Sequence, residues 1–242
     1  MKLSNNTILI TGGATGIGLG LSERFLKEGN KVIVCGRRDK ALEAAKVKFP
    51  TIITRRVDLE TESERTSLFA WIKENYPDCN VLINNAGIQQ RSSPWDDDFY
   101  VKAKQEIAIN VEAPIHLTAL FLKLDKLSVV INVTSGLSFV PLVQLPIYCA
   151  TKSFMHNFNT SLTKLLSQRK IEVIEIIPPG LNTELGGKGL HDNFPPVSEF
   201  IDAIFLQLME GKTKLSFGMS EMVSKAGPEE LEIAFNRMNP PG

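Results

Sequence analysis

Short, continuously apolar runs alternate along this chain with longer segments in which apolar residues recur at helical spacing. Runs of the first kind are typical of parallel strands buried on both faces, and segments of the second kind are typical of the helices that cover them. The alternation predicts one doubly wound α/β domain over residues 1–242. The predicted strands are 7–11, 31–35, 52–57, 80–84, 128–134, 171–177 and 214–217, and the predicted helices are 19–27, 60–76, 99–124, 147–168, 198–210 and 228–238.

A glycine-rich turn follows the first predicted strand. Residues 12–18, Gly-Gly-Ala-Thr-Gly-Ile-Gly, lead directly into a helix. Glycines allow the backbone to approach a diphosphate closely, and the helix N-terminus offers free N–H groups to it. This context indicates a dinucleotide site rather than an unliganded turn. The spacing of Gly12, Gly16 and Gly18 differs from the G-x-G-x-x-G of the usual dinucleotide fingerprint.

The second predicted strand ends in Gly36-Arg37-Arg38-Asp39. In dinucleotide-binding folds an acidic residue at this point binds the ribose 2′-hydroxyl, whereas arginine accommodates a 2′-phosphate. Gly36 occupies the place where the acid is expected, and two guanidinium groups follow it. The pattern therefore favours NADP(H), with NAD(H) as the alternative. Two solvated arginines, with Asp39 as the N-cap of the next helix, would also explain these residues.

Tyr148 and Lys152 lie four residues apart at the start of a long predicted helix, so both side chains project from one face. A cation close to a phenol favours the phenolate and lowers the phenol pKa. Such a tyrosine can exchange a proton with a substrate hydroxyl or carbonyl. The spacing alone also occurs in inert helices, so the surrounding residues decide its meaning.

Polar residues gather where the predicted parallel strands end. Asn85, Ser135 and the loop before Tyr148 join the glycine turn on the edge at which ligands bind in open parallel sheets. Residues 178–183 reach the same edge. Residues 185–196, rich in Gly and Pro, predict a mobile loop over the site.

Composition narrows the class of protein. The 27 basic and 27 acidic residues balance, and no basic block occurs, which argues against a nucleic-acid or membrane-surface role. Three scattered cysteines form neither a disulfide framework nor a zinc motif, and the three histidines lack metal-ligand spacing. No apolar stretch is long enough for a membrane span, and no signal peptide is evident. We expect a cytoplasmic protein without a metal.

Six motifs in sequence order resemble those of the short-chain dehydrogenases/reductases, and the resemblance covers nearly the whole chain. It resembles the bacterial DltE-like oxidoreductases most within that family, through its long Tyr–Lys helix and its carboxyl tail. The matching motifs are T-G-x-x-x-G-x-G at 11–18, N-N-A-G at 84–87, the helix asparagine Asn110, Ser135, Tyr148-x-x-x-Lys152, and Pro179-Gly180 with Thr183 for the later P-G-x-x-x-T element.

The resemblance implies a single-domain Rossmann fold with a parallel seven-stranded sheet, and a catalytic group of four residues. Tyr148 is the general acid/base, Lys152 lowers its pKa and binds the nicotinamide ribose, and Ser135 holds the substrate oxygen. Asn110 supports a water that relays protons to Lys152. The implied cofactor-binding residues are Gly12, Thr15, Gly16, Ile17, Gly18, Arg37, Arg38, Asp58, Leu59, Asn85, Ala86, Gly87, Tyr148, Lys152, Pro179, Gly180 and Thr183.

The resulting hypothesis is an NADP(H)-dependent oxidoreductase that acts on a small carbonyl or alcohol substrate. The family also implies a homodimer or homotetramer. One alternative is an NAD(H)-dependent alcohol dehydrogenase, and another is a non-catalytic dinucleotide-binding or redox-sensing protein. A nucleotide-sugar epimerase or dehydratase is disfavoured, because those relatives carry G-x-x-G-x-x-G and a large C-terminal substrate domain. The identity of the substrate is not encoded in any of these motifs.

Overall fold

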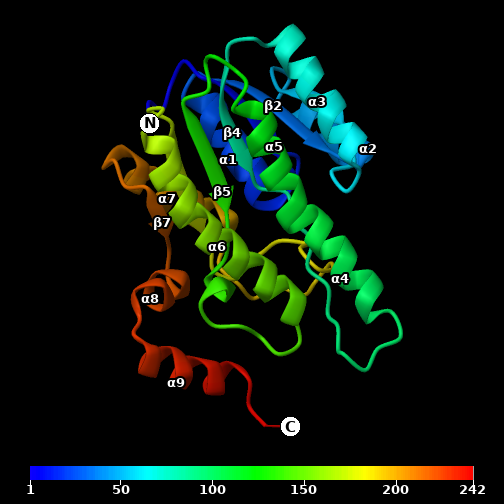
Figure 1. Cartoon of the computed structure of the whole chain (residues 1–242), viewed down its shortest axis with the longest axis vertical. Coiled ribbons are helices and arrows are strands. Elements are labelled where there is room, and N and C mark those ends of the chain that lie inside the picture. Colours follow the sequence, from blue (N-terminus) through cyan, green and yellow to red (C-terminus); the bar gives the residue numbers. More distant parts are fainter. Residues whose placement is uncertain (242) are drawn as a thin grey trace.

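The computed structural model describes residues 1–241 and contains one seven-stranded, fully parallel sheet in the order β3-β2-β1-β4-β5-β6-β7 (Figure 1). This confirms the predicted doubly wound α/β fold. The predicted strand positions agree with the observed ones to within a residue or two at each end. The strands are β1 (Thr7–Thr11), β2 (Lys31–Gly36), β3 (Ile53–Arg56), β4 (Cys79–Asn84), β5 (Val129–Val133), β6 (Glu172–Ile177) and β7 (Lys214–Ser216).

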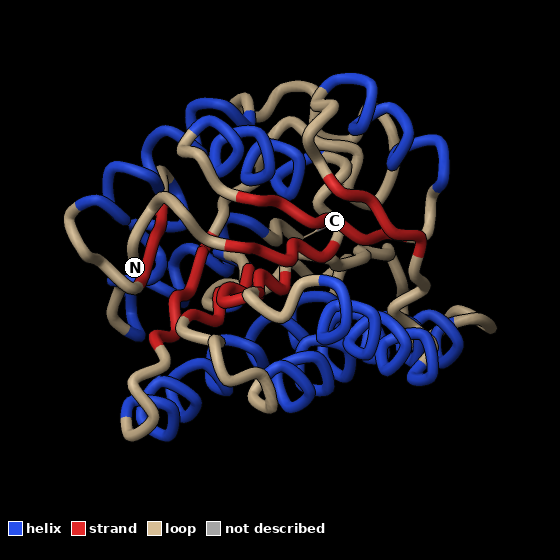
Figure 2. The backbone as a smooth tube through the Cα atoms, turned by 90° about the horizontal axis from the view of Figure 1, so that it is seen from above, coloured by secondary structure: helices blue, strands red, loops and turns tan. Residues whose placement is uncertain are grey.

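Two layers of helices enclose the sheet, one on each face (Figure 2). The side chains of α1, α2 and α7 share one buried cluster with the sheet, and those of α3, α5 and α6 share the other. The helices are α1 (Gly16–Lys27), α2 (Asp39–Lys48), α3 (Glu62–Asn75), α4 (Phe99–Ile107), α5 (Ala113–Phe121), α6 (Pro146–Ser167), α7 (Val197–Met209), α8 (Met219–Lys225) and α9 (Pro228–Met238).

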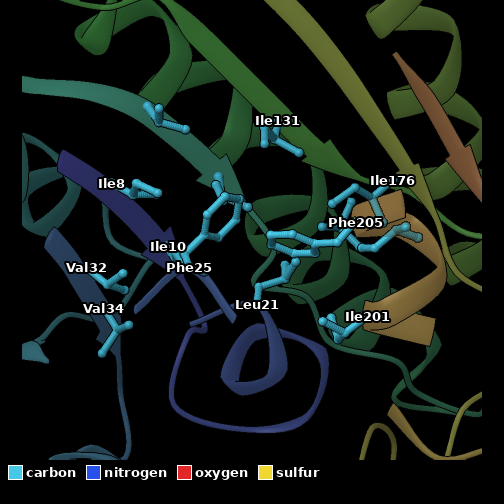
Figure 3. Close-up of a cluster of buried hydrophobic side chains, with 14 of the residues drawn as sticks. Ile8, Ile10, Leu21, Phe25, Val32, Val34, Ile131, Ile176, Ile201 and Phe205 are labelled. Carbon is cyan, nitrogen blue, oxygen red and sulfur yellow. The ribbon is translucent and has the colours of Figure 1, made fainter. Parts of the chain in front are cut away.

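The two faces of each strand supply the two halves of the core. In β1, Ile8 and Ile10 point into the cluster that Leu21, Phe25 and Phe205 fill from the helices (Figure 3), whereas Leu9 points to the opposite face. Successive strand residues alternate between faces, so a continuously apolar strand is the consequence of helices on both sides. This arrangement explains the apolar runs of the sequence.

The long helix predicted over residues 99–124 is interrupted. A π-helical segment, η1 (Ala108–Glu112), separates α4 from α5, and the N–H of Ala113 donates to the carbonyl of Ala108. Pro114 has no N–H to donate to the carbonyl of Asn110 four residues earlier, which weakens the regular helical ladder at this point. Single-turn π segments of this kind are frequent at functional sites. The widened turn carries Asn110.

The end of the chain departs most from the predicted elements. Helix α8 was not predicted, and α9, which was, has no buried residue. Both lie beyond the carboxyl ends of the strands, at the lower end of Figure 1. Within residues 1–241, no helix has the combination of length and hydropathy that crossing a bilayer demands.

Candidate active site

The glycine turn after β1 is tied to the end of β4. The Thr11 hydroxyl accepts the N–H groups of Asn85 and Ala86, each at 3.0 Å. In return, the Asn85 amide donates to the carbonyls of Thr11 at 2.9 Å and Gly12 at 3.2 Å. These bonds join the two strands between which the strand order reverses, where open α/β sheets bind their ligands.

The backbone of the turn requires glycine. Gly12 and Gly16 have φ values of +64° and +52°, in the left-handed region that side chains disfavour. A Cβ at Gly18 would overlap the carbonyl oxygen of Gly12. The first turn of α1 contains no acidic residue, and Thr15 at its N-cap makes no side-chain capping bond. Its free N–H groups and positive dipole end therefore suit the diphosphate of a dinucleotide.

The two arginines follow β2, the strand that pairs with β1. Arg37 and Arg38 are both exposed, and Arg38 Nη2 donates to the Thr15 hydroxyl at 3.0 Å. One guanidinium thus reaches the glycine turn from the neighbouring strand. Sequence reasoning did not anticipate this contact, because it joins residues on two different strand ends.

The residues after β3 are the next predicted contacts of the adenosine. Asp58 is half-buried, and its carboxylate accepts the N–H of Glu60 at 3.1 Å, while Leu59 is buried. The Val57 N–H donates to the Gly36 carbonyl at 3.0 Å, so Asp58 follows directly beside the end of β2. The structure therefore brings these predicted adenine contacts to the same edge as the arginines.

Asn110 holds the loop that follows β4. Its amide group accepts the N–H of Ile88 and donates to the carbonyl of the same residue, both at 2.9 Å. It also donates to the Thr151 hydroxyl at 3.1 Å. A Cβ added at Gly87 would stand 3.3 Å from Asn110 Oδ1 and 3.6 Å from Lys152 Nζ. The missing side chain at Gly87 thus leaves a space that both polar groups border.

Tyr148, Lys152 and Ser135 meet between β5 and the first turns of α6. Lys152 Nζ donates to the carbonyl of Val133 at 2.9 Å and lies 5.6 Å from the centre of the Tyr148 ring. Burial lowers the pKa of Lys152 to about 8. Burial also raises the pKa of Tyr148, although a hydrogen bond from Ser135 acts in the opposite direction. The lowered phenol pKa expected from the sequence is therefore outweighed here by burial of the ring.

A row of buried polar side chains holds the end of β5, which carries Ser135. The hydroxyl of Thr134, the preceding residue, donates to Glu175 Oε1 at 2.8 Å, and His156 Nδ1 lies 2.8 Å from the same oxygen. Glu175 is only 3% exposed, so these partners satisfy a carboxylate within the sheet. The strand end that carries Ser135 is consequently held in place.

The segment after β6 lies over the same edge. Thr183 borders Gly16, since a Cβ added at Gly16 would stand 3.4 Å from Thr183 Cγ2. The Phe194 ring covers Gly180, where no side chain fits, and Leu185 packs on the cluster that contains Tyr148. The predicted residues after Pro179 therefore reach the site. The mobility of residues 185–196 stays a prediction.

One ionisable group of this site was missed by sequence reasoning. Glu106, on α4, is 1% exposed, and its Oε1 accepts the N–H of Gln90 at 2.6 Å. Burial raises its pKa to about 7. Its position one helical turn before Asn110 is the signal that was available, because residues at i and i+4 share a helix face.

The raised pKa predicts a pH-dependent change in stability when Glu106 is replaced by glutamine. The folded state holds this proton more tightly than the unfolded state, so stability is complete below the ordinary value of 4.5 and is lost as pH rises through about 7. Glu106→Gln should therefore gain stability relative to the wild type between pH 4.5 and pH 8, by up to ~3 kcal/mol. Urea unfolding at both pH values measures the change.

The matched control is Glu112→Gln, which removes an exposed carboxylate from the adjoining helical segment. It should show no such pH-dependent gain. An equal stability difference for Glu106→Gln at both pH values would contradict the assignment.

Comparison with known proteins identifies the family. A family model described as short chain dehydrogenase matches residues 6–193. The uncharacterized oxidoreductase DltE of Bacillus subtilis is 39% identical, over 99% of this chain and 98% of its own length.

Two solved structures share the fold at low identity. A short chain dehydrogenase from Burkholderia cenocepacia in complex with NADP superposes with a TM-score of 0.85 at 21% identity, over 100% of both chains. A short chain dehydrogenase/reductase from Burkholderia phymatum in complex with NAD has a TM-score of 0.83 at 14% identity, over 100% of this chain and 99% of that one. The chain belongs to the short-chain dehydrogenase/reductase family and is an NAD(P)-dependent oxidoreductase.

Proposed function

We propose that this protein is an NADP(H)-dependent oxidoreductase that interconverts a small carbonyl compound and its alcohol, with residues 1–242 acting as one catalytic domain. The observation that carries the proposal is the convergence of Tyr148, Lys152 and Ser135 beside a glycine turn that suits a diphosphate. A scaffold without catalysis has no need for a phenol and an ammonium group buried together, because each ionised form is costly to bury.

The cofactor would lie along the carboxyl edge of the sheet. The turn of Gly12, Gly16 and Gly18 would hold the diphosphate, with Thr15 and Ile17 beside it. The dinucleotide supplies the hydride, and the protein supplies position and electrostatics. The remaining proposed contacts are Asp58, Leu59, Asn85, Ala86 and Gly87 on the adenosine side and after β4, and Pro179, Gly180 and Thr183 near the nicotinamide.

The proton chemistry is assigned to Tyr148. In reduction its hydroxyl donates a proton to the carbonyl oxygen, and in oxidation the phenolate accepts the proton of the alcohol. Ser135, which stands close enough to Tyr148 to lower the phenol pKa, would hold the substrate oxygen between the two residues. Because burial raises the phenol pKa, Tyr148 carries its proton at neutral pH, as a general acid must.

Lys152 and Asn110 are assigned supporting roles. Lys152 uses one N–H on the Val133 carbonyl, which leaves two donors for a ribose hydroxyl and the phenol oxygen. Asn110 fixes the backbone of Ile88, and the space beside Gly87 suits a water that passes protons to Lys152. The tightly buried ammonium group would thereby stay connected to solvent.

The preference for NADP(H) is supported by the arginines. Arg38 Nη2 donates to the Thr15 hydroxyl. Its guanidinium therefore lies between the end of β2, where the ribose would bind, and the glycine turn, where the diphosphate would bind. A forked cation at this place suits the 2′-phosphate of NADP(H). NAD(H) remains the alternative, and the arginine substitutions described below distinguish the two.

Replacement of Tyr148 by phenylalanine tests the catalytic assignment. Tyr148→Phe removes the transferable proton while it keeps the ring, so we expect NADPH binding to persist and carbonyl reduction to fall by at least ~100-fold. Dinucleotide fluorescence and NADPH oxidation with a panel of aldehydes and ketones measure the two effects. Tyr100→Phe, at a position 72% exposed, is the matched control, and near-normal turnover in Tyr148→Phe would refute the mechanism.

Replacement of both arginines tests the cofactor preference. The double variant Arg37→Ala, Arg38→Ala should weaken NADPH binding by roughly 10-fold or more, because each charge-assisted bond contributes about 1.5–3 kcal/mol. Binding of NADH should change little. Lys40→Ala removes an exposed positive charge from the same segment and serves as the control. Equal losses for both cofactors would show that these arginines do not recognise the 2′-phosphate.

We also propose that the protein forms a homodimer or homotetramer through the helical face formed by α4 and α6. Exposed apolar side chains on these helices support this assignment: Tyr100, Val101, Ile107, Phe154 and Leu165 are between 41% and 72% exposed. Light scattering at micromolar concentration should give at least twice the monomer mass of 26.8 kDa. Phe154→Glu should shift the protein toward the monomer, and a monomeric wild type would contradict the proposal.

A further inference from the structure

Arg65, on α3, is a buried cation without an acidic partner. It is 4% exposed, and none of the ion pairs formed within residues 1–241 includes it. A buried guanidinium is costly unless its N–H groups find acceptors. Nη1 of Arg65 donates to the carbonyl oxygens of Leu59 at 2.6 Å and Glu60 at 3.2 Å. The buried cation is therefore directed at the loop between β3 and α3.

Two further helices support this arrangement. Arg65 Nε donates to His116 Nδ1, on α5, at 3.1 Å. A ring nitrogen that accepts a hydrogen bond carries no proton, so the proton of His116 lies on Nε2. Gln105, on α4, donates from Nε2 to Glu60 Oε2 at 3.1 Å. The loop after β3 is thus held by side chains from α3 and α4, and its buried cation is held from α5.

Glu64, the residue before Arg65, holds the start of the same loop. Its Oε2 accepts the N–H of Asp58 at 2.6 Å. The Asp58 carboxylate in turn accepts the N–H of Glu60 through Oδ1 at 3.1 Å. Adjacent residues of α3 therefore fix the loop in two ways, because a carboxylate takes one of its N–H groups and a guanidinium takes two of its carbonyl groups.

This bonding leaves one N–H of the loop free. Of the N–H groups of residues 57–61, that of Leu59 alone meets no acceptor in the part of the chain that the structure describes. Leu59 is 7% exposed, and N–H groups of buried residues rarely lack a partner. The donor follows the Asp58 carboxylate, which has acceptor capacity beyond its bond to Glu60. A donor next to an acceptor complements the edge of adenine, where an amino group adjoins an unprotonated ring nitrogen.

We propose that Glu64 and Arg65 are positioning residues of the adenine site, which fix residues 58–60 so that the protein distinguishes adenine from other bases in its dinucleotide. The inference rests on the proposed contacts of the adenosine with Asp58 and Leu59. It extends them to two side chains whose own bonds go to the loop and to α5. Replacing either side chain should therefore weaken recognition of the base and leave the catalytic residues in place.

A comparison of two dinucleotides tests the inference without any turnover. In the hypoxanthine analogue of NADPH, an oxo group replaces the amino group of the base, and the neighbouring ring nitrogen carries a proton. Donor and acceptor are thereby exchanged, so the wild type should bind NADPH at least ~10-fold more tightly than the analogue. Both reduced dinucleotides fluoresce through their nicotinamide, so one titration method gives both dissociation constants.

Replacement of Glu64 separates positioning from a general effect on the fold. Glu64→Ala removes the acceptor of the Asp58 N–H, and the preference for NADPH over the analogue should fall to about 3-fold or less. Glu64→Gln keeps an acceptor oxygen at this place and should retain the preference. Glu62→Ala, which removes an exposed carboxylate from the same helical turn, is the matched control and should also retain it.

Replacement of Arg65 tests the other half of the arrangement. Arg65→Met leaves the carbonyl groups of Leu59 and Glu60 without their donor, and the same loss of preference is expected. Arg65→Lys keeps a cation for one of these carbonyls and should give an intermediate preference. If Arg65→Met does not fold, the Glu64 variants carry the test, because Glu64 is only half-buried.

The outcomes separate this inference from the proposed function. An undiminished preference for NADPH in either folded variant would overturn the positioning role of that residue, and so would an equal weakening of both dinucleotides. A wild type that binds both dinucleotides equally would remove the proposed adenine contacts and this inference with them. Turnover in Tyr148→Phe tests the catalytic proposal independently of these titrations.

Discussion

The hydrogen bonds between Thr11 and Asn85 are the contact on which the arrangement of this site depends. They join the ends of β1 and β4, the neighbouring strands between which the chain reverses its direction of winding. Because the Asn85 amide also bonds the Gly12 carbonyl, the shape of the glycine turn depends on the start of the loop after β4. Asn110 then holds the next residues of that loop and bonds Thr151 on α6, so the glycine turn and α6 share one support.

The chemistry depends on burial that disfavours charge on each of its ionisable groups. Burial lowers the pKa of Lys152, raises that of Tyr148 and raises that of Glu106. In each case burial disfavours the charged form of the group. The cost is lost stability, which the two apolar clusters on either face of the sheet offset.

The sequence predicted most of the fold, for physical reasons that differ between elements. The strand at Thr7–Thr11 and the helix at Pro228–Met238 were predicted to the residue, because an apolar run and a Pro-started amphipathic segment are local signals. Helix α8 was missed, since it has seven residues and buries only Ser220 and Val223. The π segment around Asn110 was anticipated only as an irregularity near Pro114, because its hydrogen-bond pattern depends on the ladder as a whole.

By itself the sequence determined the glycine turn, the Tyr148–Lys152 spacing and the family, because backbone freedom and i,i+4 geometry are properties of neighbouring residues. Only the tertiary structure decided the contact of Arg38 with Thr15, the bond from Thr134 to Glu175, and the bond from the Gln90 N–H to the buried Glu106. Each of these joins residues from separate elements. Burial, which fixes the protonation of Tyr148, likewise arises only when those elements pack, and no local pattern of residues contains it.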